Sequence, residues 1–172
     1  MRLKMKLRNI IAVAVLLAPV PFVGMTVPAE AAVDHIIVLD GWVQAEDGPS
    51  LPDPTYHDQK TPFHHQIVLT HEMTKSHASF VVSTCADDEV KATLSVGLNL
   101  LNDESVVVSP RLLLFHGSDC TTQPLDNVSP LAAHAIEGGR GGGNWQIFVP
   151  SRDYLGTNLA DANLTVTHSL WP

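Results

Sequence analysis

The stretch Val90-Lys91-Ala92-Thr93-Leu94-Ser95-Val96-Gly97-Leu98-Asn99-Leu100 alternates apolar with polar or small residues. A β-strand turns successive side chains to opposite faces, so this period of two places every apolar side chain on one face. The pattern therefore predicts a half-buried strand. Its solvent face carries Lys91, Thr93, Ser95 and Asn99.

Six further segments on either side of this stretch also have strand character, because they are rich in β-branched and large apolar residues. They cover residues 35–43, 64–72, 78–84, 105–115, 144–149 and 163–171, with a break expected at Pro110. About seven short strands with almost no helix predict an all-β fold. The expected architecture is an antiparallel β-sandwich of the jelly-roll kind.

One short helix is predicted over residues 130–137. Ser129 is suited to cap it, Pro130 suits its first position, and Gly138 suits its end. Residues 44–62 hold four prolines among polar residues, which predicts a long loop between the first two strands. Asn102-Asp103-Glu104 predicts a tight turn after the alternating strand.

The first 31 residues have the three parts of a secretory signal peptide. Basic residues at positions 2, 4, 6 and 8 precede an apolar run over residues 10–17, and Ala29-Glu30-Ala31 forms a cleavage site. A membrane anchor is the alternative, but Pro19 and Pro21 interrupt the span that it needs. We expect cleavage after Ala31, one domain over residues 32–172 with no stable membrane span, and a secreted, extracellular or periplasmic location.

The chain is acidic and carries a large negative net charge. The full sequence has a net charge of −8, and removing residues 1–31 leaves 6 Lys and Arg against 17 Asp and Glu, a net charge of −11. Phosphate-rich partners demand a basic surface, which argues against nucleic acid and anionic membranes. A protein or glycan ligand outside the cell is expected. Asn127 and Asn163 begin glycosylation sequons whose use depends on the host.

Cys85 and Cys120 are the two cysteines of the chain. Exported proteins meet an oxidising environment, where two cysteines usually pair. We therefore predict a structural disulfide between them. The alternatives are a reactive thiol or a metal ligand.

Nine histidines are many for a chain of this length. Imidazole nitrogen is a common ligand of Zn²⁺, and acidic turns supply oxygen to Ca²⁺, so either ion is a possible cofactor, although no cofactor is the expectation. A histidine pair such as 65 and 71 lies about 20 Å apart on one strand, too far to share an ion. A site therefore needs several strands, and surface histidines remain the alternative. The weak candidates are His64, His65, His71 and His116, with Asp87 and Asp88.

The aromatic residues divide into core and surface candidates. Trp42 and Trp145 alternate with apolar strand positions, which predicts burial in the core. Tyr56 and Tyr154 lie in predicted loops, so they are weak candidates for ligand contact together with Arg140. The glycine-rich run at 138–143 around Arg140 lacks the Lys and Ser/Thr of a phosphate loop and predicts a plain loop.

These observations favour a small secreted binding module that acts through its loops, without naming its ligand. Loops on a rigid sandwich carry recognition, and residues 44–62, 116–130 and 137–143 are the favoured surface. The alternative is a small secreted hydrolase, with or without a metal ion. The sequence names no catalytic residue, so enzymatic activity stays uncertain, and it leaves the oligomeric state open.

Overall fold

A computed structural model describes residues 33–49, 55–121, 124–139, 141–152 and 157–171. Every regular element in them is a β-strand. The strands are β1 (Asp34–Asp47), β2 (His57–Leu69), β3 (His77–Ala86), β4 (Val90–Leu100), β5 (Val106–His116), β6 (Leu125–Val128), β7 (His134–Ile136), β8 (Gly142–Pro150) and β9 (Leu159–Trp171). The described part of the chain contains no helix that could cross a membrane.

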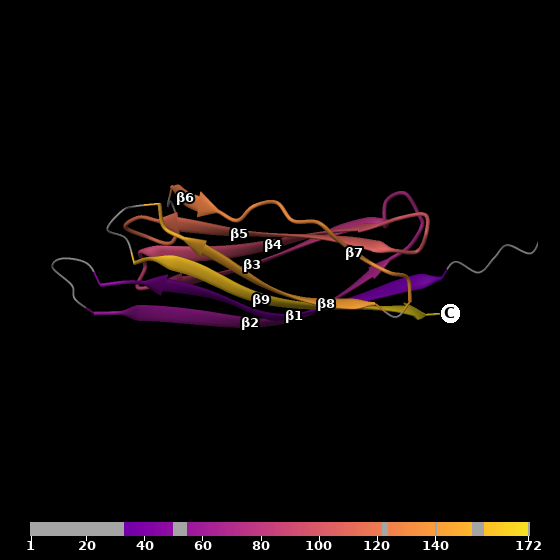
Figure 1. Ribbon diagram of the computed structural model, residues 1–172, viewed down its shortest axis with the longest axis horizontal. Helices are drawn as coiled ribbons and strands as arrows, with labels where there is room; N and C mark the ends of the chain where they lie inside the picture. The colour runs from indigo at the N-terminus through magenta and orange to yellow at the C-terminus, as the bar shows by residue number, and fades with distance from the viewer. Residues whose placement is uncertain (1–32, 50–54, 122–123, 140, 153–156, 172) are drawn as a thin grey trace, which may run out of the picture. The chain divides into compact units, whose positions relative to one another are not determined.

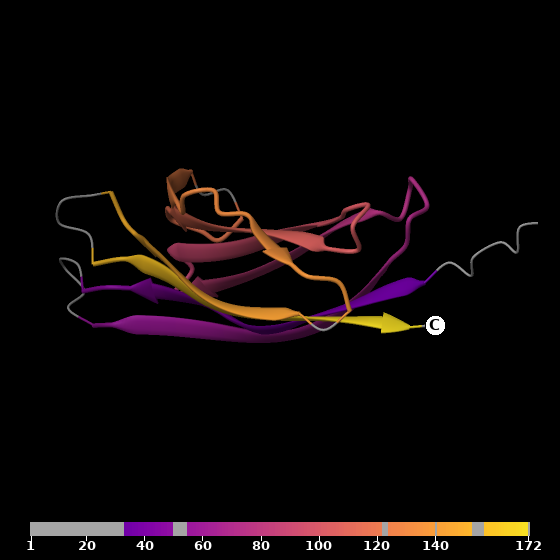
Figure 2. The same cartoon turned by 45° about the vertical axis from the view of Figure 1, so that its right-hand side comes forward.

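The strands form two antiparallel sheets that face each other (Figures 1 and 2). One sheet has the order β2-β1-β9-β8. The other has the order β3-β4-β5-β6, with β7 also pairing to β5. This is a β-sandwich, as the sequence predicts, and the two additional strands, β6 and β7, are short pieces along one edge of β5.

The core lies between the sheets and is built by alternating positions on β1, β4, β5 and β9. In β4 the residues Val90, Ala92, Leu94, Val96, Leu98 and Leu100 are all buried. The predicted face of this strand is therefore confirmed. Burying a side chain such as Leu94 contributes about 1.5–3 kcal/mol, so these rows account for most of the stability of the sandwich.

The predicted loop over residues 44–62 is wrong at both ends, because β1 continues to Asp47 and β2 begins at His57. Pro62 lies inside β2, opposite Trp42. Proline has no N–H to donate to a ladder, but β2 is an edge strand and one of its sides needs no partner. For this reason proline marks an edge here rather than a loop.

The predicted break at Pro110 is also wrong, because β5 runs through it and Pro110 pairs with Val96. On its other side β5 pairs with β7 at residues 106–108 and with β6 at residues 113–115. Pro110 lies between these two pairings. Its missing N–H therefore costs the sheet nothing at that point.

The helix predicted over residues 130–137 does not form. Ser129 instead bonds to β5: its Oγ accepts from the N–H of Leu112 at 3.0 Å, and its own N–H donates to the carbonyl of Leu112 at 2.9 Å. Residues 134–136 then pair with β5 as β7. The hydroxyl that suits a helix cap is used across the sheet edge, so tertiary pairing overrides the local signal.

The disulfide between Cys85 and Cys120 is present, with 6.2 Å between the two Cα atoms. It ties the end of β3 to the segment that follows β5. The Nζ of Lys91 donates to the carbonyl of Cys120 at 3.2 Å, which adds a second link at the same place.

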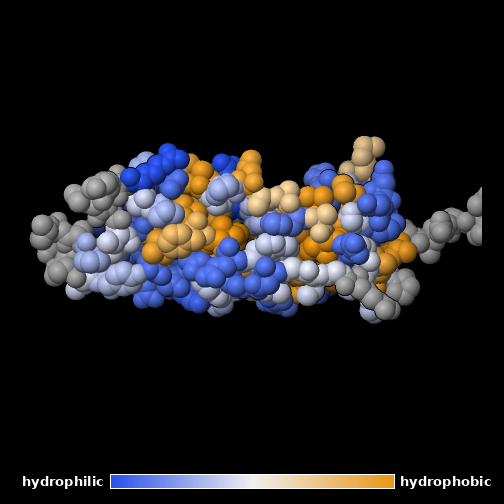
Figure 3. All heavy atoms as spheres, viewed as in Figure 1, coloured by the Kyte–Doolittle hydropathy of each residue, from blue (hydrophilic) through white to orange (hydrophobic). Residues whose placement is uncertain are grey.

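The outer surface is mainly hydrophilic, with apolar patches between the charged residues on the face shown in Figure 3. Trp42 lies on the outer face of β1, where the Nζ of Lys60 stands 3.5 Å from its ring centre, so the prediction that Trp42 joins the core is wrong. Trp145 is partly buried and packs against the core, which agrees with its prediction.

Candidate functional site

Two histidines close the core at one end of the sandwich. His35 on β1 and His168 on β9 continue the inward-facing rows of these strands, and their exposed fractions are 0% and 3%. The two strands are neighbours in one sheet. A hydrogen bond of 2.9 Å joins Nδ1 of His35 to Nε2 of His168. A buried polar pair therefore takes the place that apolar side chains fill elsewhere in the row.

Glu104 reaches this end from the opposite sheet, through the tight turn that joins β4 to β5. The N–H of Leu101 donates to the carbonyl of Ser105 at 2.8 Å, and Asp103 accepts from the main chain and the hydroxyl of Ser105. Glu104 has a φ of 66°, in the left-handed region that side chains other than glycine rarely adopt. Backbone strain of this kind gathers at functional sites, which directs attention to this carboxylate.

His71 lies in the connection between β2 and β3. Its turn is closed by the N–H of Thr70, which donates to the carbonyl of Lys75 at 3.1 Å. The N–H of Leu100 donates to the carbonyl of Ser76 at 2.8 Å and fixes the turn to the end of β4. The turn that holds His71 is thereby anchored beside the turn that holds Glu104.

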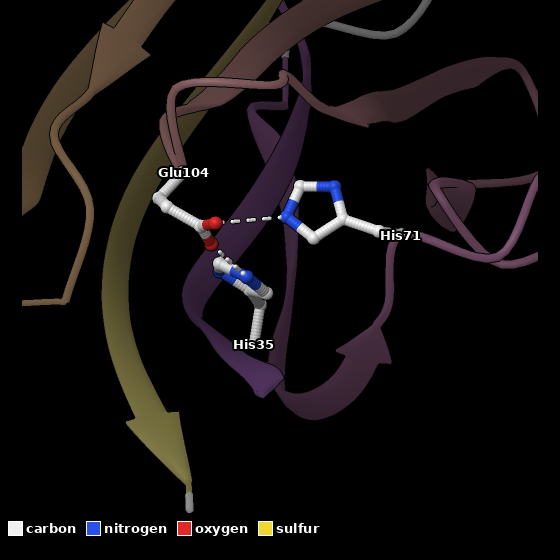
Figure 4. Close-up of side chains that lie close together, drawn as sticks. All are labelled: His35, His71 and Glu104. Carbon is white, nitrogen blue, oxygen red and sulfur yellow. Dashed lines mark hydrogen bonds and ion pairs between the residues drawn. The ribbon is translucent and has the colours of Figure 1, made fainter. Parts of the chain in front are cut away.

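His35, His71 and Glu104 meet in what we call the histidine–glutamate cluster (Figure 4). The carboxylate of Glu104 lies between the two rings: Oε2 is 2.6 Å from Nε2 of His35, and Oε1 is 3.1 Å from Nε2 of His71. The three residues offer ligand atoms that lie within 4.8 Å of one another. Three elements from distant parts of the chain thus bring two nitrogens and a carboxylate to one place.

The two atoms that lie closest together in the cluster lack well-formed hydrogen bonds. Nε2 of His35 and Oε2 of Glu104 are both buried, and neither makes a hydrogen bond of good geometry despite their separation of 2.6 Å. Buried polar atoms nearly always have a partner, so this pair calls for an explanation. A cation bound by both atoms would satisfy them together. The cluster is accessible to solvent on the side of His71 and Glu104, because both side chains are almost half exposed.

Burial lowers the pKa of His168, and the charge of His35 lowers it further, against smaller opposing effects of the Glu137 main chain and of Glu104. The neutral form of His168 is therefore favoured at neutral pH. A neutral imidazole has one donor and one acceptor nitrogen. Nε2 of His168 can thus accept a hydrogen bond from Nδ1 of His35.

The donor set indicates which ions fit. Zn²⁺ and related transition ions take histidine nitrogen and carboxylate oxygen, with bonds of about 2.0–2.2 Å and commonly four ligands. Ca²⁺ takes six to eight oxygens, which two imidazoles do not supply. The cluster therefore matches a transition ion and not Ca²⁺.

Of the histidines singled out from the sequence, His71 alone belongs to the cluster. His64 lies on β2 opposite Asp40, and its Nδ1 is 2.5 Å from Oδ1 of that aspartate. His65 stacks on Phe80, with ring centres 5.0 Å apart. The two residues point to opposite faces of β2, so they do not converge on one site.

His116 and Asp87 are found at the other end of the sandwich, with Asp47 and His57. Nε2 of His57 is 3.7 Å from Oδ2 of Asp87. Burial raises the pKa of Asp47, and the negative charges of Glu89 and Asp87 add to this, against the opposing effect of His116 and His57. These groups interact through their charges, and among the described residues no three of them bring ligand atoms within 4.8 Å of one another, as the histidine–glutamate cluster does.

Asp88 has a carboxylate close to the sulfurs of Cys85 and Cys120. Both sulfurs belong to the disulfide, and a disulfide has no thiolate to offer to a metal ion. The grouping therefore has no ligand set of its own.

Of the three residues predicted to contact a ligand, Tyr56, Tyr154 and Arg140, the structure describes Tyr56 alone. The ring of Tyr56 is exposed, and its hydroxyl donates to the carboxylate of Glu46, which raises the pKa of Tyr56 to about 12. Arg140 and Tyr154 lie outside the described residues. The hydroxyl of Tyr56 is therefore occupied, while its ring is free to pack against a ligand.

A shallow groove of about 380 Å³ lies along the side of the sandwich. Its aromatic wall is formed by His134 stacked on Trp145, with ring centres 4.8 Å apart, and by the exposed ring of Phe148. Aromatic surfaces of this kind suit a sugar ring or an apolar side chain. The groove is lined by Pro110, Ser129, Pro130, Ala132, His134, Trp145, Gln146, Ile147 and Phe148.

No protein-family model and no curated protein matches this chain.

Proposed function

We propose that this chain is a secreted β-sandwich that binds one divalent ion of the Zn²⁺ class through His35, His71 and Glu104. The observation that carries the proposal is the meeting of three ligand atoms within 4.8 Å, one of which, Nε2 of His35, is buried and faces Oε2 of Glu104 at 2.6 Å without hydrogen-bond geometry. Two imidazoles and one carboxylate are a donor set that zinc sites use.

Turns between strands would supply most of this site, as in a binding module that acts through its loops. Two of the three ligands, His71 and Glu104, come from turns between strands. These turns differ from the loops favoured by the sequence, at 44–62, 116–130 and 137–143. The third ligand, His35, lies on β1, so a strand within the sheet holds the buried part of the site and the two turns supply the rest.

A secreted or periplasmic location is part of the proposal. The disulfide supports it, because such bonds persist where the environment is oxidising. Export is tested by sequencing the N-terminus of the protein recovered outside the cytoplasm. A start at Ala32 supports it, and a start at Met1 contradicts it.

Metal binding is tested on the purified protein without an affinity tag. After EDTA treatment and buffer exchange, titration with Zn²⁺ followed by calorimetry and elemental analysis should give one ion per chain. His71→Ala and Glu104→Gln should each remove most of this binding. His64→Ala is the matched control, because His64 is a histidine outside the cluster, and it should bind as the wild type does.

Two outcomes contradict the proposal. One is that the wild type holds no stoichiometric Zn²⁺ at micromolar concentrations. The other is that His71→Ala and Glu104→Gln bind with unchanged stoichiometry and affinity, which would place the ion elsewhere.

A metal-assisted hydrolase is the second candidate. The observation that favours it is the number of ligands, since three protein ligands leave a tetrahedral ion one position for water, as in catalytic zinc sites. The zinc-loaded protein should then hydrolyse an activated ester such as p-nitrophenyl acetate, and Glu104→Gln should abolish this activity. Equal rates for the loaded wild type, the variant and free Zn²⁺ would exclude this candidate.

A further inference from the structure

Described residues of the connection between β7 and β8 lie beside the histidine–glutamate cluster. The N–H of His168 donates to the carbonyl of Gly141 at 2.9 Å, which ties this connection to β9. Gly138 lies against the main chain of Glu104. Gly138 and Gly141, from the glycine-rich run that the sequence predicts to be a plain loop, thus contact the surroundings of two ligands.

His168 is the hydrogen-bond partner of Nδ1 of His35, so it bears on which nitrogen of His35 carries the proton. For Nε2 of His35 to offer a lone pair to an ion, the proton must be on Nδ1, where it can be donated to Nε2 of His168 at 2.9 Å. Metal-binding histidines usually donate their second N–H to such a partner, which fixes the ring and its tautomer. Without an acceptor, the buried Nδ1–H would be unsatisfied and the tautomer protonated on Nε2 would compete.

Gly138 determines where the turn of Glu104 can lie. A Cβ added at Gly138 would be 2.8 Å from Cβ of Glu104 and 3.0 Å from its carbonyl oxygen. Real Cβ atoms do not approach this closely, and both atoms belong to or adjoin the main chain, so the turn itself would have to move. Glycine at position 138 therefore permits the turn to press against the cluster.

We infer that His168 and Gly138 form a second coordination sphere, in which His168 fixes the tautomer of His35 and Gly138 holds the turn of Glu104. This inference rests on the proposed function. Neither residue contributes a ligand. Both are positioning residues, and their substitution changes the affinity for the ion while the ligand set stays the same.

The role of His168 is tested by comparing His168→Phe with His168→Gln. Phenylalanine keeps a ring but removes the acceptor, so Zn²⁺ should bind 10–100-fold more weakly. Glutamine places an amide oxygen near the position of Nε2 and should restore affinity to within a few-fold of the wild type. His134→Phe, which changes a histidine in the groove, is the control and should leave affinity unchanged.

Cobalt spectroscopy separates positioning from direct ligation. The Co²⁺-loaded His168→Phe variant should show the same visible absorption bands as the wild type, reached only at higher Co²⁺ concentration. Bands that change in position or intensity at saturation would mean that His168 is itself a ligand and would overturn the inference. Wild-type affinity in His168→Phe would overturn it as well.

Gly138→Ala should also weaken Zn²⁺ binding, by about tenfold or more, because Glu104 is displaced. Gly97→Ala is the matched control, since a Cβ at that position meets Ser109 at an ordinary 3.8 Å. Circular dichroism confirms that each variant is folded before titration. Absence of Zn²⁺ binding in the wild type would refute the proposed function and this inference with it, whereas binding that is equal in the wild type and in both variants refutes the inference alone.

Discussion

Nε2 of His35 lies 2.6 Å from Oε2 of Glu104 across the end of the sandwich. His35 belongs to the four-stranded sheet and Glu104 to the hairpin of the five-stranded sheet. Main-chain ladders run within each sheet, so contact between the sheets depends on side chains. A cation held by this pair would therefore stabilise the packing of one sheet on the other.

Zinc should accordingly raise the thermal stability of the EDTA-treated protein. An ion that binds only the folded state at 100 times its Kd stabilises by about 2.7 kcal/mol, which corresponds to a melting temperature higher by roughly 10 °C. Ca²⁺ at the same concentration should produce no shift. Differential scanning fluorimetry measures both, and a Zn²⁺ shift that persists in Glu104→Gln would contradict the role of the cluster.

Glu104→Asn should separate stability from binding. Asparagine adopts positive φ more readily than glutamate, so the turn loses strain and the metal-free protein should gain up to about 1 kcal/mol. The shorter side chain cannot reach both histidines, so the Zn²⁺-induced stabilisation should disappear. Urea denaturation with and without Zn²⁺ checks both effects, and a variant that is less stable without metal would argue against strain at this position.

Asp47→Asn should stabilise the protein at neutral pH. Burial raises the pKa of Asp47 in the folded state, so the favourable contribution of its protonated form is present below the unfolded-state pKa and is lost as the pH rises through the folded-state pKa. Asparagine stays neutral and avoids the cost of the buried charge. The gain in urea midpoint should be clear at pH 7 and should shrink toward pH 3. A gain that is equal at both values would point to packing instead.

Removal of the disulfide should destabilise the protein by about 4 kcal/mol on the chain-entropy estimate, since Cys85 and Cys120 are 35 residues apart. The double variant Cys85→Ala/Cys120→Ala avoids a free thiol and reports this loss in urea denaturation. Zinc binding should survive under conditions where the variant is folded, because the cluster has no cysteine ligand. Loss of zinc from the folded variant would contradict this separation.

The strand framework could be predicted because it follows from local patterns. Strict alternation over 90–100 locates β4 and its buried face without other information. The predicted helix at 130–137 and the predicted break at Pro110 are wrong because pairing between strands determines the structure at both places. Ser129 bonds to β5 instead of capping a helix, and Pro110 lies between two short pairings, where its missing N–H does no harm. Neither fact can be read from the residues that surround these positions.

The site could be predicted only in part. His71 is a candidate from the sequence. Its partners His35 and Glu104 are not, because only the order of the strands and the course of two turns bring them close to His71. One signal was present: His35 continues the inward row of Ile37 and Leu39, and His168 continues that of Leu164 and Val166. Histidines in a core row indicate a polar site between sheets. The position of Glu104 above them depends on how the second sheet is placed.

The covalent link between Cys85 and Cys120 and the histidine–glutamate cluster lie at opposite ends of β4, which begins at Val90 and ends at Leu100. With the proposed ion bound, the sandwich would have a separate link between its parts at each end, one sensitive to reductants and one to chelators. Native proteins open in local units with their own free energies. Chelation should hasten amide hydrogen exchange around residues 101–105, and reduction should hasten it around residues 85–90. The two ends of one small domain would then fray independently, each reporting a different property of the surroundings.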